Sequence, residues 1–385
     1  MKKSLFALAA VGAMSSAAHA QSSVTVYGLF DGGLVTQSVE FAAARTKQTL
    51  NTVGGQQSSN GSGTINGSRL GFRGVEDLGG GTSAGFVMEV GIAYNGTNSL
   101  SAATASEAIS ASTGNVAMFG NTRQAYGSLA NKGFGEIRIG TQDTLTKGNT
   151  ETFDPLGGAS ITGAASLYQQ SLVTRASGAL TYVSPAISGA TVRLQFQNDQ
   201  TTTSTTTTTG RNNAAFNADL IYRTGDLVVG GSYQNMSNVK IVAGANNSIN
   251  QLSANGTTAL DGSVTFYNVG ASYDLKVAKP TVLYYNQKVS GITTASSGTI
   301  SGTLFGVTLP VTNTISLLGS YTLGKVTNSG TGLYDTSARQ VAAVYTLSKR
   351  SNLYAIYGAT DFKTKVTTTS NVNFASYGVG MRHSF

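Results

Sequence analysis

The sequence contains no cysteine and no tryptophan, and only four prolines and two histidines among 385 residues. Without cysteine it can form no disulfide, offer no thiolate to a metal, and carry no lipid on an N-terminal cysteine. Once an N-terminal signal containing His19 is removed, His383 is the sole histidine. A Ser-His-Asp site and a zinc site are therefore not expected. The sequence predicts neither an enzyme nor a bound metal or other cofactor.

Charged residues are also scarce, at 11% of the chain, with a formal net charge of +8. The basic residues form no polybasic run, so nucleic acid is not an expected partner. Beyond residue 20, no apolar run reaches the ~18 residues that indicate a membrane-spanning helix. Membrane-spanning strands are not excluded by this, because alternating strands carry no continuous hydropathy signal.

The first 20 residues have the organisation of a secretory signal peptide. Two lysines precede an apolar stretch from about Leu5 to Ala13, and an Ala-His-Ala tripeptide at 18–20 provides a cleavage site of small residues. We expect cleavage after Ala20, which leaves residues 21–385 as the exported domain.

The exported part is rich in alternation of apolar and polar residues. The stretch GATVRLQFQND, for example, sets Val192, Leu194 and Phe196 against Arg193 and Gln195. Such alternation is typical of a strand with one apolar and one polar face, and helical periodicity is not sustained anywhere. Sixteen strands are expected, near residues 22–37, 66–76, 82–95, 117–130, 134–142, 173–184, 189–199, 212–224, 226–239, 263–274, 280–290, 302–311, 314–327, 337–348, 351–363 and 373–385.

The connections between these strands alternate in length. Tight turns such as EDLGGG and SPAIS alternate with polar stretches at 38–65, 96–116, 143–172, 200–211, 240–262, 291–301, 328–336 and 364–372. A membrane barrel with short periplasmic turns and long extracellular loops has this asymmetry. Sixteen strands would enclose too wide a space for side chains to fill. The apolar face should therefore point into lipid, with aromatic residues such as Tyr94, Tyr182, Tyr222, Tyr273 and Tyr345 at its edges, and the polar face should line water. The prediction is an all-β, 16-stranded antiparallel transmembrane barrel.

Several stretches then resemble the β-proteobacterial type of trimeric Gram-negative outer-membrane porin. SSVTVYGLFDGGL resembles its first strand, SRLGFRGVEDLGGGTSAGFVMEV its second and third, TRQAYGSLANKGFGEIRIGTQD its fourth and fifth, and YTLSKRSNLYAIYGATD with YGVGMRHSF its last three. The resemblance implies a homotrimer in the outer membrane of a Gram-negative bacterium, passing inorganic ions and small hydrophilic solutes by general diffusion. A substrate-specific channel is the alternative within transport. A surface adhesin built from a β-solenoid is the alternative of another class, although the irregular strand spacing argues against a fixed repeat.

In this family the third loop folds into the barrel and narrows it, with acidic residues facing arginines on the wall. By position the matching loop spans 143–172 and carries Asp143, Glu151 and Asp154. A ring of cationic side chains favours anions, so a mild anion preference is expected. The candidates on the polar faces of the strands are Arg69, Arg73, Arg123 and Arg175, with Arg138 and Arg193 as weaker ones.

The last predicted strand carries a lipid-facing series of residues, Tyr377, Val379, Met381, His383 and Phe385. We expect it to pair with the first strand, because closure leaves no unpaired backbone edge in hydrocarbon. His383 is expected at the periplasmic interface. The aromatic residue at position 385 resembles the terminal signature that outer-membrane assembly machinery recognises.

Overall fold

The computed structural model describes residues 23–41, 46–53, 56–58, 61–92, 94, 97–100, 109–112, 119–158, 174–198, 214–241, 260–290, 297–328, 331–365 and 371–385. The predicted signal peptide, 1–20, lies outside these residues. The main sheet consists of β1 (Ser23–Phe41), β2 (Thr46–Val53), β5 (Arg69–Gly79), β6 (Thr82–Ile92), β9 (Phe119–Asn131), β10 (Gly135–Asp143), β11 (Arg175–Val183), β12 (Ala190–Gln197), β13 (Ala215–Thr224), β14 (Leu227–Ile241), β15 (Leu260–Tyr273), β16 (Lys279–Ser290), β17 (Gly298–Pro310), β18 (Ile315–Asn328), β19 (Thr331–Thr346), β20 (Ser351–Thr364) and β21 (Val372–Ser384).

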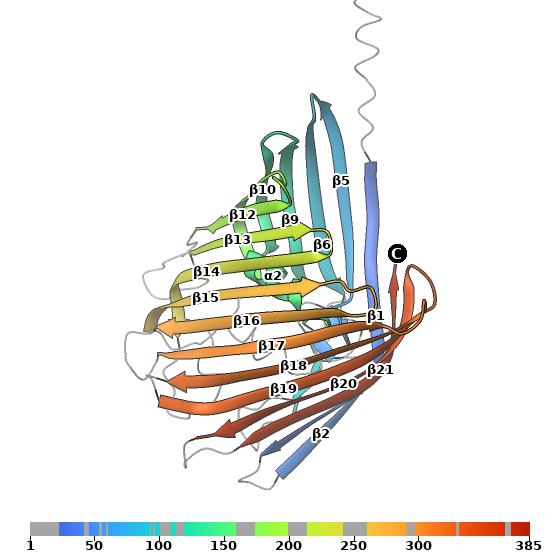
Figure 1. Cartoon of the computed structure of the whole chain (residues 1–385), viewed down its shortest axis with the longest axis vertical. Coiled ribbons are helices and arrows are strands. Elements are labelled where there is room, and N and C mark those ends of the chain that lie inside the picture. The colour runs from blue at the N-terminus through green and yellow to red at the C-terminus, as the bar shows by residue number, and fades with distance from the viewer. Residues whose placement is uncertain are drawn as a thin grey trace, which may run out of the picture.

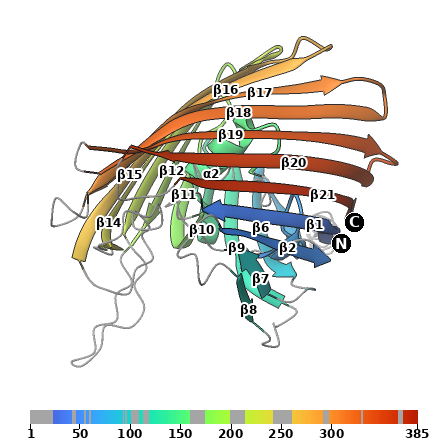
Figure 2. The ribbon, with the colours of Figure 1, turned by 90° about the horizontal axis from the view of Figure 1, so that it is seen from below.

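Sixteen of these strands form a closed antiparallel barrel (Figures 1 and 2). From β5 to β21 each strand pairs with the next one in the sheet, β1 pairs with β5 through residues 23–29, and β21 pairs back with β1 through residues 29–41 of β1. The predicted strand number is therefore confirmed, and the β-solenoid alternative is excluded. The seventeenth strand, β2, lies outside the ring and pairs only with residues 34–41 of β1.

The outer face of the barrel is apolar, as the alternation predicts. Val192, Leu194 and Phe196 are each at least 40% exposed, whereas the intervening Gln195 is buried. Aromatic residues follow the outer edge near the short turns, where Tyr182, Tyr222, Tyr273 and Tyr345 are exposed. Tyr94 does not belong to this belt, because its hydroxyl donates to the backbone carbonyl of Asp31.

The inner face carries the polar side chains that the alternation predicts, together with apolar ones that the alternation does not predict. Between β14 and β20 it carries a buried apolar cluster that includes Phe266, Leu283, Leu304 and Phe362. The cluster also contains Phe153, which lies in the connection between β10 and β11. This part of the wall is apolar because a connection packs on it.

The connections differ from the predicted loops in four places. The stretch 328–336 is mostly strand, since β18 and β19 are joined by only two residues, 329–330. The stretches 38–65 and 96–116 contain β2 and two small hairpins, β3 (Gln56–Ser58) with β4 (Gly61–Gly63) and β7 (Thr97–Leu100) with β8 (Ile109–Ser112). The stretch 143–172 contains a helix, α2 (Leu145–Phe153), which the sequence patterns did not predict.

Among the described residues, no helix has the length and hydropathy needed to cross a membrane.

The seam between β1 and β21 is completed by close packing as well as by hydrogen bonds. Gly28 and Phe385 exchange two backbone hydrogen bonds of 3.0 and 3.1 Å. The ring of Phe385 covers Gly28, and a Cβ atom at position 28 would lie 2.3 Å from a ring carbon. Only glycine allows the ring this close to the backbone of β1.

Replacing Gly28 with alanine should weaken this seam. The added methyl group overlaps the Phe385 ring and the Arg69 carbonyl oxygen, so we expect a loss of about 1–3 kcal/mol in the free energy of unfolding. The midpoint of heat unfolding, followed on unheated polyacrylamide gels, measures the effect. Gly127→Ala is the matched control, because a Cβ atom there would meet its nearest atom at 3.9 Å. Equal midpoints for the two variants would contradict the account of the seam.

Candidate functional site

The helix α2 lies inside the barrel, against the inner faces of β13 to β16 (Figure 2). Thr146 donates a hydrogen bond of 3.2 Å to the side chain of Gln234, and Asn268 donates one of 2.7 Å to the hydroxyl of Thr150. Phe153 packs flat on Gly270, where a Cβ atom would come within 2.4 Å of its ring. The helix is therefore fixed to the wall by side chains along its length.

The chain after α2 continues inside the barrel towards β19 and β1. Asp154 accepts hydrogen bonds from the backbone N–H groups of Leu156 and Gly158, at 3.1 and 2.8 Å, and one of 3.2 Å from Gln340. Leu156 is buried in a second apolar cluster with Val35 of β1 and residues of β18 to β20. The described part of this connection therefore packs on the inner wall from β13 round to β20 and β1.

Five consecutive strands of the ring, β5, β6, β9, β10 and β11, present charges of alternating sign to the interior. In ring order these are Arg69 on β5, Glu89 on β6, Arg123 on β9, Asp143 at the end of β10 and Arg175 at the start of β11. Arg123 Nε lies 2.6 Å from Glu89 Oε1, and Arg69 lies 3.9 Å from the same oxygen. Arg175 Nη1 lies 2.5 Å from Asp143 Oδ1. We call these five residues the charged row.

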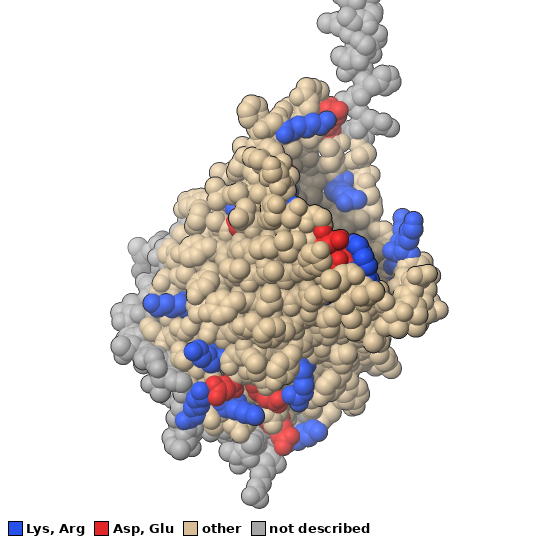
Figure 3. Space-filling view, in the orientation of Figure 1, with Lys and Arg blue, Asp and Glu red and all other residues tan. Residues whose placement is uncertain are grey.

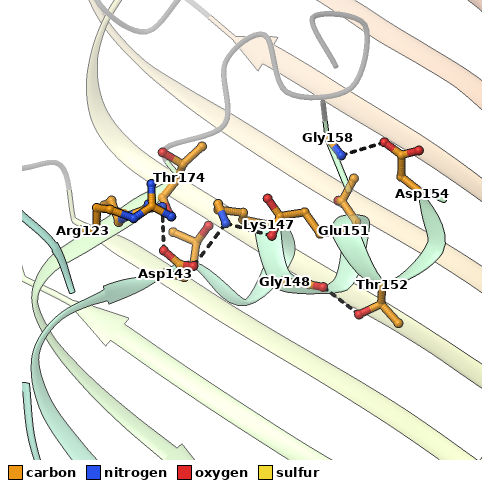
Figure 4. Close-up of polar contacts among 12 residues, drawn as sticks. Arg123, Asp143, Lys147, Gly148, Glu151, Thr152, Asp154, Gly158 and Thr174 are labelled. Carbon is orange, nitrogen blue, oxygen red and sulfur yellow. Dashed lines mark hydrogen bonds and ion pairs between the residues drawn. The ribbon is translucent and has the colours of Figure 1, made fainter. Parts of the chain in front are cut away.

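The helix adds two further charges to the row (Figure 4). Lys147 lies between two carboxylates, 3.1 Å from Asp143 and 2.8 Å from Glu151. Together the row and the helix bring four cations and three carboxylates to one level of the lumen. Most of these side chains keep some access to water, with Arg69, Asp143 and Glu151 at 27%, 29% and 33% exposure. The site therefore combines a small positive excess with side chains that water can reach.

A β-bulge turns Arg123 towards the lumen. The pairing between β6 and β9 joins Glu89 to Gln124 but Val90 to Thr122, so Arg123 is the extra residue of the bulge. Strict alternation from the outward-facing Leu129 would place Arg123 on the outer face. Arg123 therefore reaches its predicted position on the inner face only because the bulge redirects its side chain. It brings Arg123 against Glu89, where both side chains are less than 10% exposed.

The other predicted residues lie apart from the charged row. Arg138 pairs with Glu136 at 2.7 Å, and Arg193 donates to Asp219 at 2.9 Å. Arg73 lies over the ring of Tyr27, 5.4 Å from its centroid. Asp154 is 4% exposed and bonded within its own turn, so the structure does not bring it to the row.

The sequence patterns missed Glu89 and Lys147, although each had a signal. Glu89 occupies the polar side of the predicted strand at 82–95. Asp143, Lys147 and Glu151 are spaced four residues apart, which is the spacing of ion pairs along one face of a helix. That spacing predicts both the helix and the placement of Lys147 between the two carboxylates.

A second buried network, centred on Asp31 of β1, also escaped the sequence patterns. The Asp31 carboxylate is fully buried and accepts hydrogen bonds from the backbone N–H groups of Thr64, Ile65 and Asn66 at 3.1, 3.3 and 2.8 Å. Tyr354 of β20 donates to the same carboxylate at 2.5 Å. This network holds the segment before β5 against the inner wall, where Ile65 joins the apolar cluster of Leu156.

The closing strand has the predicted orientation. Tyr377, Val379, Met381 and Phe385 are 59%, 54%, 44% and 46% exposed on the outer face. His383 is also exposed, and its Nδ1 lies 2.8 Å from the hydroxyl of Ser351, next to the short turn between β19 and β20. Within the described ranges, no group of three or more His, Cys, Asp or Glu side chains is placed to hold a metal ion.

Comparison with known proteins gives one consistent result. The sequence profile of the Gram-negative porin family matches residues 7–365. An outer membrane porin protein of Bordetella pertussis is 27% identical over the full length of both chains, and outer membrane porin protein 32 of Delftia acidovorans is 36% identical over 40% of this chain and 35% of its own. The anion-selective porin from Comamonas acidovorans superposes with a TM-score of 0.68 at 22% identity, covering 95% of this chain and all of its own. The trimer form of OmpT from Vibrio cholerae superposes with a TM-score of 0.63 at 15% identity, covering 94% and 99%.

Replacing Gly270 with alanine should loosen α2, because the added methyl group would lie 2.4 Å from the ring of Phe153. We expect greater fluctuation of the open-channel current in a planar bilayer, together with a loss of about 1–3 kcal/mol in stability. Gly319→Ala is the control, since a Cβ atom there has no neighbour closer than 3.7 Å. An open-channel current as steady as that of the wild type, with unchanged stability, would show that the position of α2 does not depend on this contact.

Proposed function

Since the chain belongs to the Gram-negative porin family, we propose that it forms a general diffusion porin with a mild preference for anions. It is an outer-membrane β-barrel that passes ions and small hydrophilic solutes. The observation that carries the proposed selectivity is the charged row, whose three arginines and two carboxylates lie beside Lys147 and Glu151 of α2 on the inner wall.

The physical basis is the field of the row inside a narrow aqueous path. Arg69, Arg123 and Arg175 outnumber Glu89 and Asp143 on the wall, and Lys147 offsets Glu151 on the helix. Low-dielectric walls focus this field into the water between them, and an excess of cationic side chains favours anions. Because the excess is a single charge, the preference is mild. The strong local field of these alternating charges orients nearby water, which favours polar solutes over apolar ones.

The roles of the individual residues follow from their surroundings. Arg69, Arg123 and Arg175 supply the cations of the wall, Glu89 and Asp143 supply the carboxylates between them, and Glu151 adds a carboxylate from α2. Arg138 and Arg193 are each paired with a carboxylate in the strands, so they contribute less to selectivity. Arg73 adds a positive charge nearer the short turns. Asp154 shapes the turn after α2 rather than the passage.

Replacing Arg69, Arg123 and Arg175 with glutamine should shift selectivity towards cations, because the row would keep only its two carboxylates. Reversal potentials under a salt gradient measure the shift, and single variants should each give part of it. Glu89→Gln should act in the opposite direction and strengthen the anion preference. Lys132→Gln is the control, since this exposed lysine lies in the short turn between β9 and β10. If the triple variant kept the selectivity of the wild type, the row would not be the selective site.

A substrate-specific channel is the second candidate. Specific side chains fix α2 to the wall, so the passage beside it has a defined shape. A class of solutes that binds in this passage would saturate transport. Conductance that rises in proportion to salt concentration favours general diffusion, whereas saturation by one class of solute favours the alternative.

Trimer formation is part of the proposal. Its support is the family itself and the trimer form of OmpT, which has the same fold. Mass measurement of the folded protein in detergent tests it directly, and a single subunit at working concentrations would exclude it.

The assembly role of the closing strand is also a proposal. Tyr377, Val379, Met381 and Phe385 offer an exposed apolar row on β21, which outer-membrane assembly machinery could bind before the barrel closes. Phe385→Ala should lower the amount of folded protein in the outer membrane several-fold. The same variant refolded in detergent separates assembly from stability. A normal amount of folded protein in cells would remove Phe385 from this role.

A further inference from the structure

Charged side chains gather on the outer face of the barrel at the ends of β18, β19 and β20 that lie near the long connections (Figure 3). Elsewhere on these strands the outer face is apolar, with Leu323, Val341 and Tyr357 at 49%, 50% and 41% exposure. The charged positions continue the same outward series along each strand, so they belong to the lipid-facing side. We call them the rim patch, which consists of Lys325, Asp335, Arg339, Asp361, Lys363 and Lys365.

Strand register places the rim patch in one compact array. Lys325 pairs with Asp335 across β18 and β19, and Asp335 pairs with Lys363 across β19 and β20. The two lysines are therefore about 9.5 Å apart, twice the spacing between strands. Lys365 lies 2.7 Å from Asp335, and Arg339 lies 2.7 Å from Asp361. The two acids thus hold two of the cations in place, and four cations against two acids leave a charge of +2.

Neighbouring sequence does not offset this charge. The segments that join these strands beyond the patch, 329–330 and 366–370, read Ser-Gly and Val-Thr-Thr-Thr-Ser. At the opposite rim, Lys276 is paired with two carboxylates, Asp226 at 2.5 Å and Asp274 at 3.6 Å. The short turn between β19 and β20 at that rim carries only two charged residues, Lys349 and Arg350, so the rim patch is distinguished by its array of four cations and not by the sign of its charge.

We propose that the rim patch binds the phosphate groups of the phosphorylated glycolipid of the outer leaflet, lipopolysaccharide. Long connections of such barrels face the cell exterior, so the patch lies at the level of the outer headgroups. Lys325 and Lys363 then meet phosphate oxygens, while the exposed apolar residues below them contact acyl chains. Lysine suits this role because its ammonium group binds phosphate as a point charge without a fixed geometry. The inference rests on the outer-membrane location and not on ion selectivity.

The test uses the folded protein in detergent, with bisphosphorylated lipid A as the probe. Binding is measured by native mass spectrometry over a range of lipid concentrations. Lys325→Gln combined with Lys363→Gln should weaken binding roughly tenfold or more, since a lysine near an anionic headgroup contributes about 1 kcal/mol. Dephosphorylated lipid A should bind the wild type as weakly as lipid A binds the double variant. Lys132→Gln combined with Lys349→Gln removes the same charge from the short turns and should leave binding unchanged.

Three results would overturn the proposal. The double variant could bind lipid A as tightly as the wild type, or dephosphorylated lipid A could bind equally well, which would assign the contact to acyl chains alone. The double variant could also lose its subunit association while it keeps its affinity for lipid A, which would make the patch a subunit interface. The reversal potential of the double variant should match that of the wild type. Loss of lipid A binding and loss of ion selectivity can therefore be told apart.

Discussion

Closure of the sheet on itself is the constraint on which the rest of the structure depends. A backbone N–H or C=O group without a partner in hydrocarbon costs several kcal/mol, and the pairing of β21 with β1 leaves no such edge in the ring. Gly28 makes the last step of this closure possible, because it admits the ring of Phe385. With the sheet closed, every strand has one face towards lipid and one towards the interior. Each strand therefore needs an apolar series of side chains for the lipid and a second series for the interior, and the sequence shows both.

The interior is too wide for the strands to fill, and the chain fills part of it with its own connections. The connection between β10 and β11 packs α2 on an apolar wall, and its continuation meets Ile65, which the Asp31 network holds in place. These contacts leave the charged row on the remaining wall, beside α2. The passage is therefore defined by two parts of the chain that are far apart in sequence. Its selectivity depends on the small difference between their charges.

Much of the fold could be predicted from the sequence. In a strand, side chains alternate between two faces, so the alternation of apolar and polar residues shows which residues share a face. The sixteen strands and the outward series of β21 follow from it. The arginines of β5 and β11 could be assigned to the lumen for the same reason. Arg123 reaches the row only through a bulge, and a bulge leaves no periodic signal. The inner apolar wall and the Asp31 network could not be predicted, since both depend on which connection folds inward and where it docks. The helix α2 was missed although the spacing of Asp143, Lys147 and Glu151 indicates it.

The central claim is that a row of fixed charges, with one cation in excess, sets the selectivity of a water-filled passage. The most direct measurement is the reversal potential of the wild-type channel in a planar bilayer across a gradient of potassium chloride, repeated at several salt concentrations. The account predicts a permeability to chloride moderately above that to potassium, with the difference shrinking as salt screens the row. A preference for potassium, or a ratio independent of salt, would contradict it.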